Sequence, residues 1–155
     1  MLQRIQSVYL LLAGLALFAL FFFPLVHGVY IDDKLVSIMV TGVFQNVNGH
    51  LVHIQFFVAL TAATVIVGLI PLIIIFLYKN RKLQVVLCYI AMLVIIGYSF
   101  WMSQEAKKIM GSVQIDTHNG GIGLFLSTIS ILLIAFAQKA IQRDEKLVKS
   151  ADRLR

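Results

Sequence analysis

The chain has 155 residues, of which 60% are hydrophobic and only 13% are charged, and its formal net charge is +6. Soluble domains carry roughly 25% charged residues, so this composition excludes an ordinary water-soluble globular domain. The charges cluster in short segments between long uncharged runs. This pattern is typical of polytopic membrane proteins, and it places the positive excess next to lipid rather than on a nucleic-acid-binding surface.

Four apolar runs are each long enough to cross a membrane as a helix, because about 20 helical residues span a hydrocarbon core of roughly 30 Å. They cover residues 8–26, 54–78, 83–102 and 121–140. The first follows Arg4, as a signal peptide would, but its flank FPLVHG has no A-x-A-like cleavage site, so we interpret it as a retained helix. We therefore predict an all-α membrane protein, a four-transmembrane-helix bundle that forms a single integral membrane domain over residues 1–155.

The segment between the first two runs, residues 27–53, is rich in β-branched and aromatic side chains. Two turn signals interrupt it, DDK at 32–34 and NG at 48–49. Asn-Gly suits a two-residue hairpin because both positions tolerate positive φ. We predict a small extracytoplasmic antiparallel β-sheet, which must rest on helix ends because so small a sheet is not stable alone. In the second outer loop, residues 113–115 offer another short strand.

The packing of the helices is suggested by one short link and by small residues. Residues 79–82 alone join the second and third runs, and so short a link forces an antiparallel helical hairpin. Small residues permit close approach of membrane helices, and such pairs occur at Thr64 and Gly68 and at Gly123 and Ser127.

The lysine and arginine residues predict the orientation, because the cytoplasmic loops of membrane proteins carry the excess of them. If the N-terminus is cytoplasmic, that side carries ten: Arg4, Lys79, Arg81, Lys82, Lys139, Arg143, Lys146, Lys149, Arg153 and Arg155. The other side carries three: Lys34, Lys107 and Lys108. We therefore predict that both termini are cytoplasmic. Tyr98 and Trp101 then fall at the outer interface, where aromatic residues form belts.

The sequence offers no pattern for catalysis. It has no His-Glu-x-x-His, Gly-x-Ser-x-Gly or phosphate-binding loop, so we expect no enzymatic activity, no catalytic residue and no cofactor. The apolar runs hold no Asp, Glu, Arg or His in their interiors, whereas ion-coupled transporters need such a group at membrane depth. A small transporter or channel is therefore an alternative function rather than the first hypothesis.

The histidines are the candidate metal ligands, because imidazole titrates near neutrality and binds zinc. His50, His53 and His118 all fall on the outer side. Their spacing matches no stereotyped metal motif, so we interpret them as polar residues at the membrane interface and expect no bound metal. Sensing of lipid or metal by this face is a further alternative function.

The last segment, residues 141–155, is rich in charge, and no Gly or Pro follows Gly123. We therefore expect the fourth helix to continue into the cytoplasm. Four apolar residues recur there at helical spacing and form the predicted partner-binding face: Leu147, Val148, Ala151 and Leu154. A helix lying on lipid and a solvated extension are the alternatives.

The two ends of the chain carry a family resemblance. The start MLQRIQSVYLLLA, the end RDEKLVKSADRLR and the cluster YKNRKLQ after the second run resemble a family of small four-helix membrane proteins of Bacteroidota, domain of unknown function 4293. The resemblance implies a bacterial inner-membrane location and a four-helix architecture, and it implies no activity. Both end motifs fall on the predicted cytoplasmic side, where they would form one surface.

Together these observations predict a non-enzymatic integral membrane protein that serves as an accessory or assembly subunit of a larger inner-membrane complex. Protein translocation and envelope biogenesis are the kinds of complex that we consider. The expected partners are membrane lipid and that larger complex, with no nucleic acid.

Overall fold

The computed structural model describes residues 3–31, 34–47, 50–78, 80–110 and 121–153. Within these ranges the chain forms four α-helices, one short 3-10 helix and one four-stranded sheet. In chain order the elements are α1 (Gln3–Phe18), η1 (Ala19–Phe21), β1 (Val26–Ile31), β2 (Lys34–Met39), β3 (Gly42–Val47), β4 (His50–Phe56), α2 (Val58–Phe76), α3 (Arg81–Met110) and α4 (Ile122–Arg153). The prediction of four helices, with a small antiparallel sheet between the first two, is confirmed.

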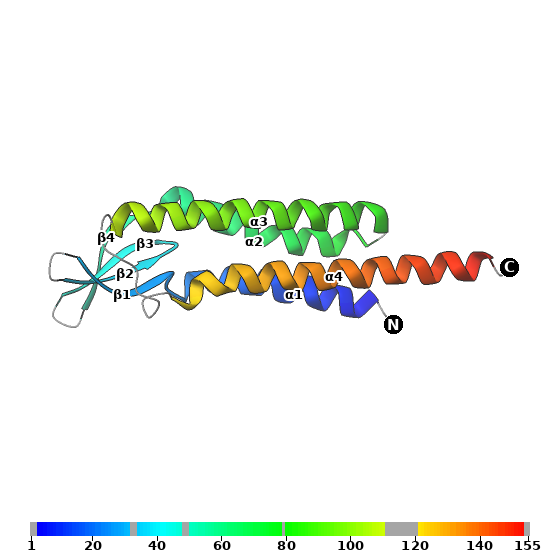
Figure 1. Cartoon of the computed structure of the whole chain (residues 1–155), viewed down its shortest axis with the longest axis horizontal. Helices are drawn as coiled ribbons and strands as arrows, with labels where there is room; N and C mark the ends of the chain where they lie inside the picture. The colour runs from blue at the N-terminus through cyan, green and yellow to red at the C-terminus, as the bar shows by residue number, and fades with distance from the viewer. Residues whose placement is uncertain (1–2, 32–33, 48–49, 79, 111–120, 154–155) are drawn as a thin grey trace.

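The four helices lie side by side in an elongated bundle, with the sheet at one end and the chain termini towards the other (Figure 1). Helix α1 packs against α2 and α4, and α3 packs against the same two helices. Each helix contributes fully buried residues to one apolar core, among them Leu10, Ile74, Ile95 and Ile134. We call the end of the bundle opposite the sheet the terminal end.

Three helices, α2, α3 and α4, are long and apolar enough to cross a membrane. Helix α1 begins and ends earlier than the predicted 8–26, because it starts at Gln3, the α-helix ends at Phe18 and the 3-10 turn ends at Phe21. Pro24 explains the early end, since proline disfavours helix in the residue before it and has no N–H to donate. The next residue, Leu25, already donates its N–H to the Ile38 carbonyl oxygen at 2.8 Å and so leads into the sheet.

The other predicted helix boundaries differ at the sheet side. Residues 54–56 belong to β4 rather than to the second helix, and α3 continues past the predicted end at Met102 to Met110. The sequence SQEAKKI after Met102 consists mostly of good helix formers. Helix α4 runs unbroken to Arg153, which confirms the predicted helical extension.

The sheet is an antiparallel meander in the order β1-β2-β3-β4. Residues 32–33 and 48–49 of the two predicted turns lie outside the described residues, and strands pair on either side of them, with Ile31 opposite Lys34 and Val47 opposite His50. A further turn, not predicted from the sequence, precedes Gly42, which has a φ of 153°. A Cβ there would lie 2.1 Å from the Gln55 carbonyl oxygen, so only glycine fits. The predicted strand at 113–115 lies outside the described residues.

The sheet rests on the helix ends through backbone hydrogen bonds. Phe57 donates its N–H to Thr41 at 3.0 Å, and Gly121 donates to Leu25 at 2.9 Å. Gly123 donates in the same way to Pro24 at 3.0 Å. These last two bonds satisfy donors at the start of α4 that no helical carbonyl can reach.

Tyr98 does not lie in an interfacial belt as predicted. Its side chain is only 4% exposed, and its hydroxyl lies 2.6 Å from the Thr64 hydroxyl. The tyrosine therefore joins α3 to α2 inside the bundle. Trp101, one turn further along α3, is exposed.

Candidate functional site

A buried polar pair joins the two ends of the chain at the terminal end. The Gln6 amide nitrogen Nε2 donates a hydrogen bond to Asp144 Oδ2, although the residues are 138 apart in sequence. Each side chain is only 6% exposed. A buried carboxylate is costly unless it is hydrogen-bonded, so this contact fixes the position of α1 on α4. The structure thus brings together the two end motifs that carry the family resemblance.

The corner between α2 and α3 adds further polar groups to the terminal end. Gln84 is buried, and its Nε2 donates to the Ile74 carbonyl oxygen at 3.2 Å. Within the described part of the chain, the buried Arg81 Nη1 has no hydrogen-bond partner. Arg81 and Lys82 line a groove of about 620 Å³, and Glu145 of α4 also lines it.

Two more grooves open at the terminal end. One has a volume of about 580 Å³, and its lining includes Gln6 and Tyr78. The other has a volume of about 340 Å³ and lies between α1 and α4, where Tyr9, Lys139 and Arg143 line it. The terminal end therefore combines buried polar contacts with open, partly basic hollows.

The predicted partner-binding residues lie on the last turns of α4. Leu147 is 50% exposed and Val148 is 47% exposed. Ala151 belongs to the helix, but its side chain lies outside the described residues, as does all of Leu154. Ile141, which precedes this group in the same apolar pattern, is fully buried. The pattern thus begins inside the bundle and continues past it.

Of the candidate metal ligands, only the His53 side chain is described, and those of His50 and His118 lie outside the described residues. The His53 ring stacks on Phe44 with centroids 4.3 Å apart and contacts Phe56 at 3.8 Å. Within the described residues, no three His, Cys, Asp or Glu side chains gather as metal ligands would. The His53 side chain is thus packed among aromatic rings.

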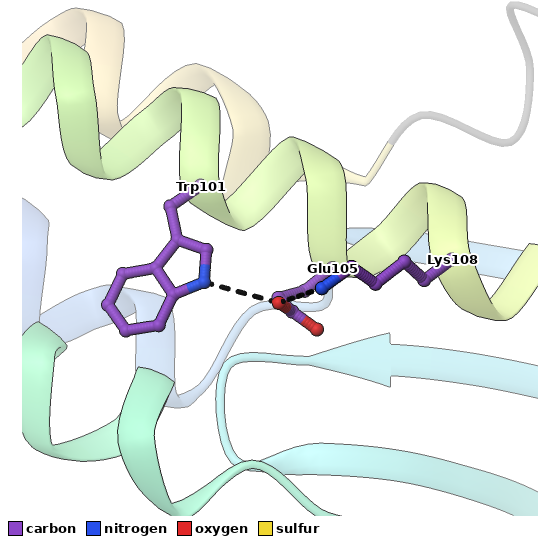
Figure 2. A network of polar contacts seen from close by, with 3 residues as sticks. All are labelled: Trp101, Glu105 and Lys108. Carbon is purple, nitrogen blue, oxygen red and sulfur yellow. Dashed lines mark hydrogen bonds and ion pairs between the residues drawn. The ribbon is translucent and has the colours of Figure 1, made fainter.

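A small polar network lies on α3 near the sheet (Figure 2). Glu105 Oε1 accepts a hydrogen bond from Trp101 Nε1 at 3.2 Å and forms an ion pair with Lys108 Nζ at 2.8 Å. These residues are three and four positions apart, so they share one face of the helix. The network marks where α3 changes from apolar to charged residues.

Asp144, which accepts the hydrogen bond from Gln6 at the terminal end, was not predicted as a site residue from the sequence. A signal for it was present in the spacing. Ile134, Ala137, Ile141 and Asp144 follow one another at intervals of three or four residues, and all are buried. Periodicity alone places Asp144 on the buried face of α4, where a carboxylate requires a partner.

Comparison with known proteins identifies one family for this chain. A search of curated proteins finds no match to the chain. The profile of a domain of unknown function, DUF4293, matches residues 2–154 and therefore includes both the QRIQS and RDEK stretches that meet at the terminal end. The resemblance found in the sequence is thus confirmed, and the chain belongs to the DUF4293 family.

Proposed function

We propose that this chain is a non-enzymatic, multi-pass protein of the bacterial inner membrane, and that it serves as an accessory or assembly subunit of a larger membrane complex. The three long apolar helices support insertion into a membrane. Helix α1 contributes a fourth crossing, because its apolar part together with η1, Ile5–Phe21, extends about 27 Å. That total is about the thickness of a hydrocarbon core.

In the proposed orientation the terminal end faces the cytoplasm. The start of α1 and the end of α4 lie on the same side of the bundle, opposite the sheet (Figure 1). In the sequence, ten lysine and arginine residues fall in the segments assigned to the cytoplasmic side and three in those assigned to the other side. Such a bias over short loops supports cytoplasmic termini.

The observation that carries the proposed role is a stripe of buried residues on α4. Its spacing continues past Asp144, the last of these residues that the bundle buries. The stripe recurs every three or four residues: Gly123, Ser127, Ser130, Ile134, Ala137, Ile141 and Asp144 are all buried. The same spacing predicts residues 148 and 151 as the next members. These are Val148, which is 47% exposed, and Ala151.

Gln6, near the described start of α1, already contacts Asp144, and Val148, one turn further along α4, is left half exposed by the described residues. Figure 1 shows α4 continuing beyond the other helices. A helix of a partner subunit that continues the packing of α1 fits this seam best. The basic residues around it, Lys146, Lys149 and Arg153, favour a partner with an acidic flank.

Truncation tests the proposal best when it leaves the bundle intact. A chain that ends at Lys146 keeps the Gln6–Asp144 contact and loses Val148 and Ala151. We expect this chain to insert into membranes normally and to lose its partner, measured by mass spectrometry after gentle solubilisation. If the shortened chain co-purifies with every partner of the full chain, the proposed role is wrong.

A point substitution with a matched control gives a second readout. Val148→Glu adds one negative charge on the seam, and Gln142→Glu adds one charge off it. With a photo-crosslinking residue at Leu147, we expect one discrete membrane protein as the crosslinked product in the native chain. Val148→Glu should abolish that product and Gln142→Glu should keep it. Crosslinks only to further copies of this chain would contradict an accessory role and indicate self-assembly.

A further inference from the structure

The groove of about 340 Å³ between α1 and α4 has an apolar floor. The rings of Tyr9 and Phe136 form it, with centroids 6.0 Å apart and planes inclined by 42°. Ile5 lies beside them and is 48% exposed, and Phe136 is 51% exposed. Half-exposed aromatic and aliphatic side chains that line one groove indicate a binding site for an apolar group.

The rim of this groove is positive. Lys139 and Arg143 both line it, both are exposed, and they stand one helical turn apart on the same face of α4. Asp144 is the acidic residue of the lining, but it is buried and accepts a hydrogen bond from Gln6. The groove thus offers two cations to a ligand, while its carboxylate is already engaged within the protein.

The groove lies where the surface of α4 changes from apolar to charged. No charged residue occurs in α4 before Lys139. An exposed apolar row leads from the groove along α4 towards the sheet, with members three or four residues apart: Phe136, Leu132, Ile129 and Phe125. Arg143 follows Phe136 by seven residues, or two helical turns, so it lies on the same face of α4 at the terminal end of this row.

We propose that this groove binds one anionic phospholipid. The phosphate lies between Lys139 and Arg143, since arginine pairs with phosphate through two hydrogen bonds and lysine through a point charge. One acyl chain lies over Tyr9 and Phe136 and follows the exposed row of α4. A free phosphate would leave that row uncovered, which is why the lipid is the favoured source of the phosphate. The inference rests on the membrane location proposed above and not on the partner subunit.

Binding is measured on the purified full chain in neutral detergent, by native mass spectrometry and by thermal stability. The probes are phosphatidylglycerol, phosphatidylcholine with the same acyl chains, and inorganic phosphate. We expect one phosphatidylglycerol to be retained and to raise the unfolding temperature more than phosphatidylcholine does. The variant Lys139→Gln with Arg143→Gln should bind phosphatidylglycerol at least about tenfold more weakly, the ratio produced by one lost charge-assisted hydrogen bond.

The matched control is Lys107→Gln with Lys108→Gln, which removes the same charge on α3 at the sheet end of the bundle and should bind as the native chain does. Phe136→Ser tests the floor and should also weaken lipid binding, and because Phe136 is half exposed the bundle tolerates the change. The proposal fails if the Lys107→Gln, Lys108→Gln control loses as much binding as the Lys139→Gln, Arg143→Gln variant. It also fails if phosphatidylcholine binds as tightly as phosphatidylglycerol. Equal protection by inorganic phosphate would also overturn it. Sedimentation of the chain with cell membranes tests the membrane location separately.

Discussion

The Tyr98 hydroxyl donates a hydrogen bond to the Thr64 hydroxyl, 2.6 Å away, and so joins α3 to α2 in the bundle interior. The direction follows from the second contact of Thr64, whose own hydroxyl donates to the Leu60 carbonyl oxygen at 2.7 Å. Tyr98 is therefore satisfied by Thr64, while Thr64 keeps a partner on its own helix. In this contact between α3 and α2, the Tyr98 hydroxyl bonds only to Thr64, whereas the Thr64 hydroxyl also bonds to Leu60 of its own helix.

Tyr98→Phe should therefore lower the free energy of unfolding only modestly, by about 0.5–1.5 kcal/mol. The ring stays packed, and Thr64 still bonds Leu60. The matched control is Tyr89→Phe on the same helix. Tyr89 is exposed, so the loss of its hydroxyl should not change the free energy of unfolding measurably. Denaturant titration in mixed micelles gives both values. An equal effect of the two substitutions would contradict a stabilising contact between α2 and α3.

Gly121→Ala should destabilise the join between α4 and the sheet. An added Cβ would lie 2.1 Å from the Pro24 carbonyl oxygen and 2.8 Å from the Leu25 carbonyl carbon, and neither backbone atom can move without breaking the nearby hydrogen bonds. Overpacking of this kind costs about 1–3 kcal/mol or more. Gly97→Ala is the control, since a Cβ there meets no atom within 4 Å. It should leave the unfolding temperature unchanged or raise it.

The helices and most of the sheet could be predicted because their signals are local. Long apolar runs and two turn motifs define them, and the continuity of α4 follows from the absence of Gly and Pro after Gly123. The end of the first helix was predicted too far along the chain because VYLLLAGLALFALFFFPLV is apolar throughout. Hydrophobicity does not distinguish the helix from the strand entry that Pro24 and the bond from Leu25 to Ile38 impose.

The contacts between distant segments were harder to predict. Tyr98 looked like an interfacial residue because its position along the helix fits a belt, but which face it occupies depends on how α2 packs. The turn at Gly42 lacks a strong dipeptide signal, since the sequence there reads MVTGV. The Gln6–Asp144 pair depends on the approach of segments 138 residues apart, which spacing within one helix cannot reveal.

The proposed orientation can be tested with single cysteines in a Cys88→Ala background. Cys88 is fully buried in α3, so its removal takes away the native thiol without opening the surface. Lys107→Cys lies at the sheet side and Lys146→Cys at the terminal end, and both positions are exposed. An impermeant thiol reagent should label the first in intact cells and the second only after lysis. Labelling of Lys146→Cys in intact cells would reverse the proposed orientation.

The Gln6–Asp144 contact should show strong coupling in a double-substitution cycle. Gln6→Leu leaves the Asp144 carboxylate buried without its partner, and the free energy of unfolding should fall by about 1–3 kcal/mol or more. Gln6→Leu with Asp144→Leu should recover much of that loss, because replacing both partners by apolar groups leaves no polar atom unsatisfied. Asp144→Asn is the conservative control, since its amide oxygen can still accept from Gln6. Denaturant titration of the native chain, Gln6→Leu, Asp144→Leu and the double variant gives the four values of the cycle, and Asp144→Asn is measured beside them. If the double variant loses the sum of the two single losses, the residues act independently, and the pair does not fix α1 on α4.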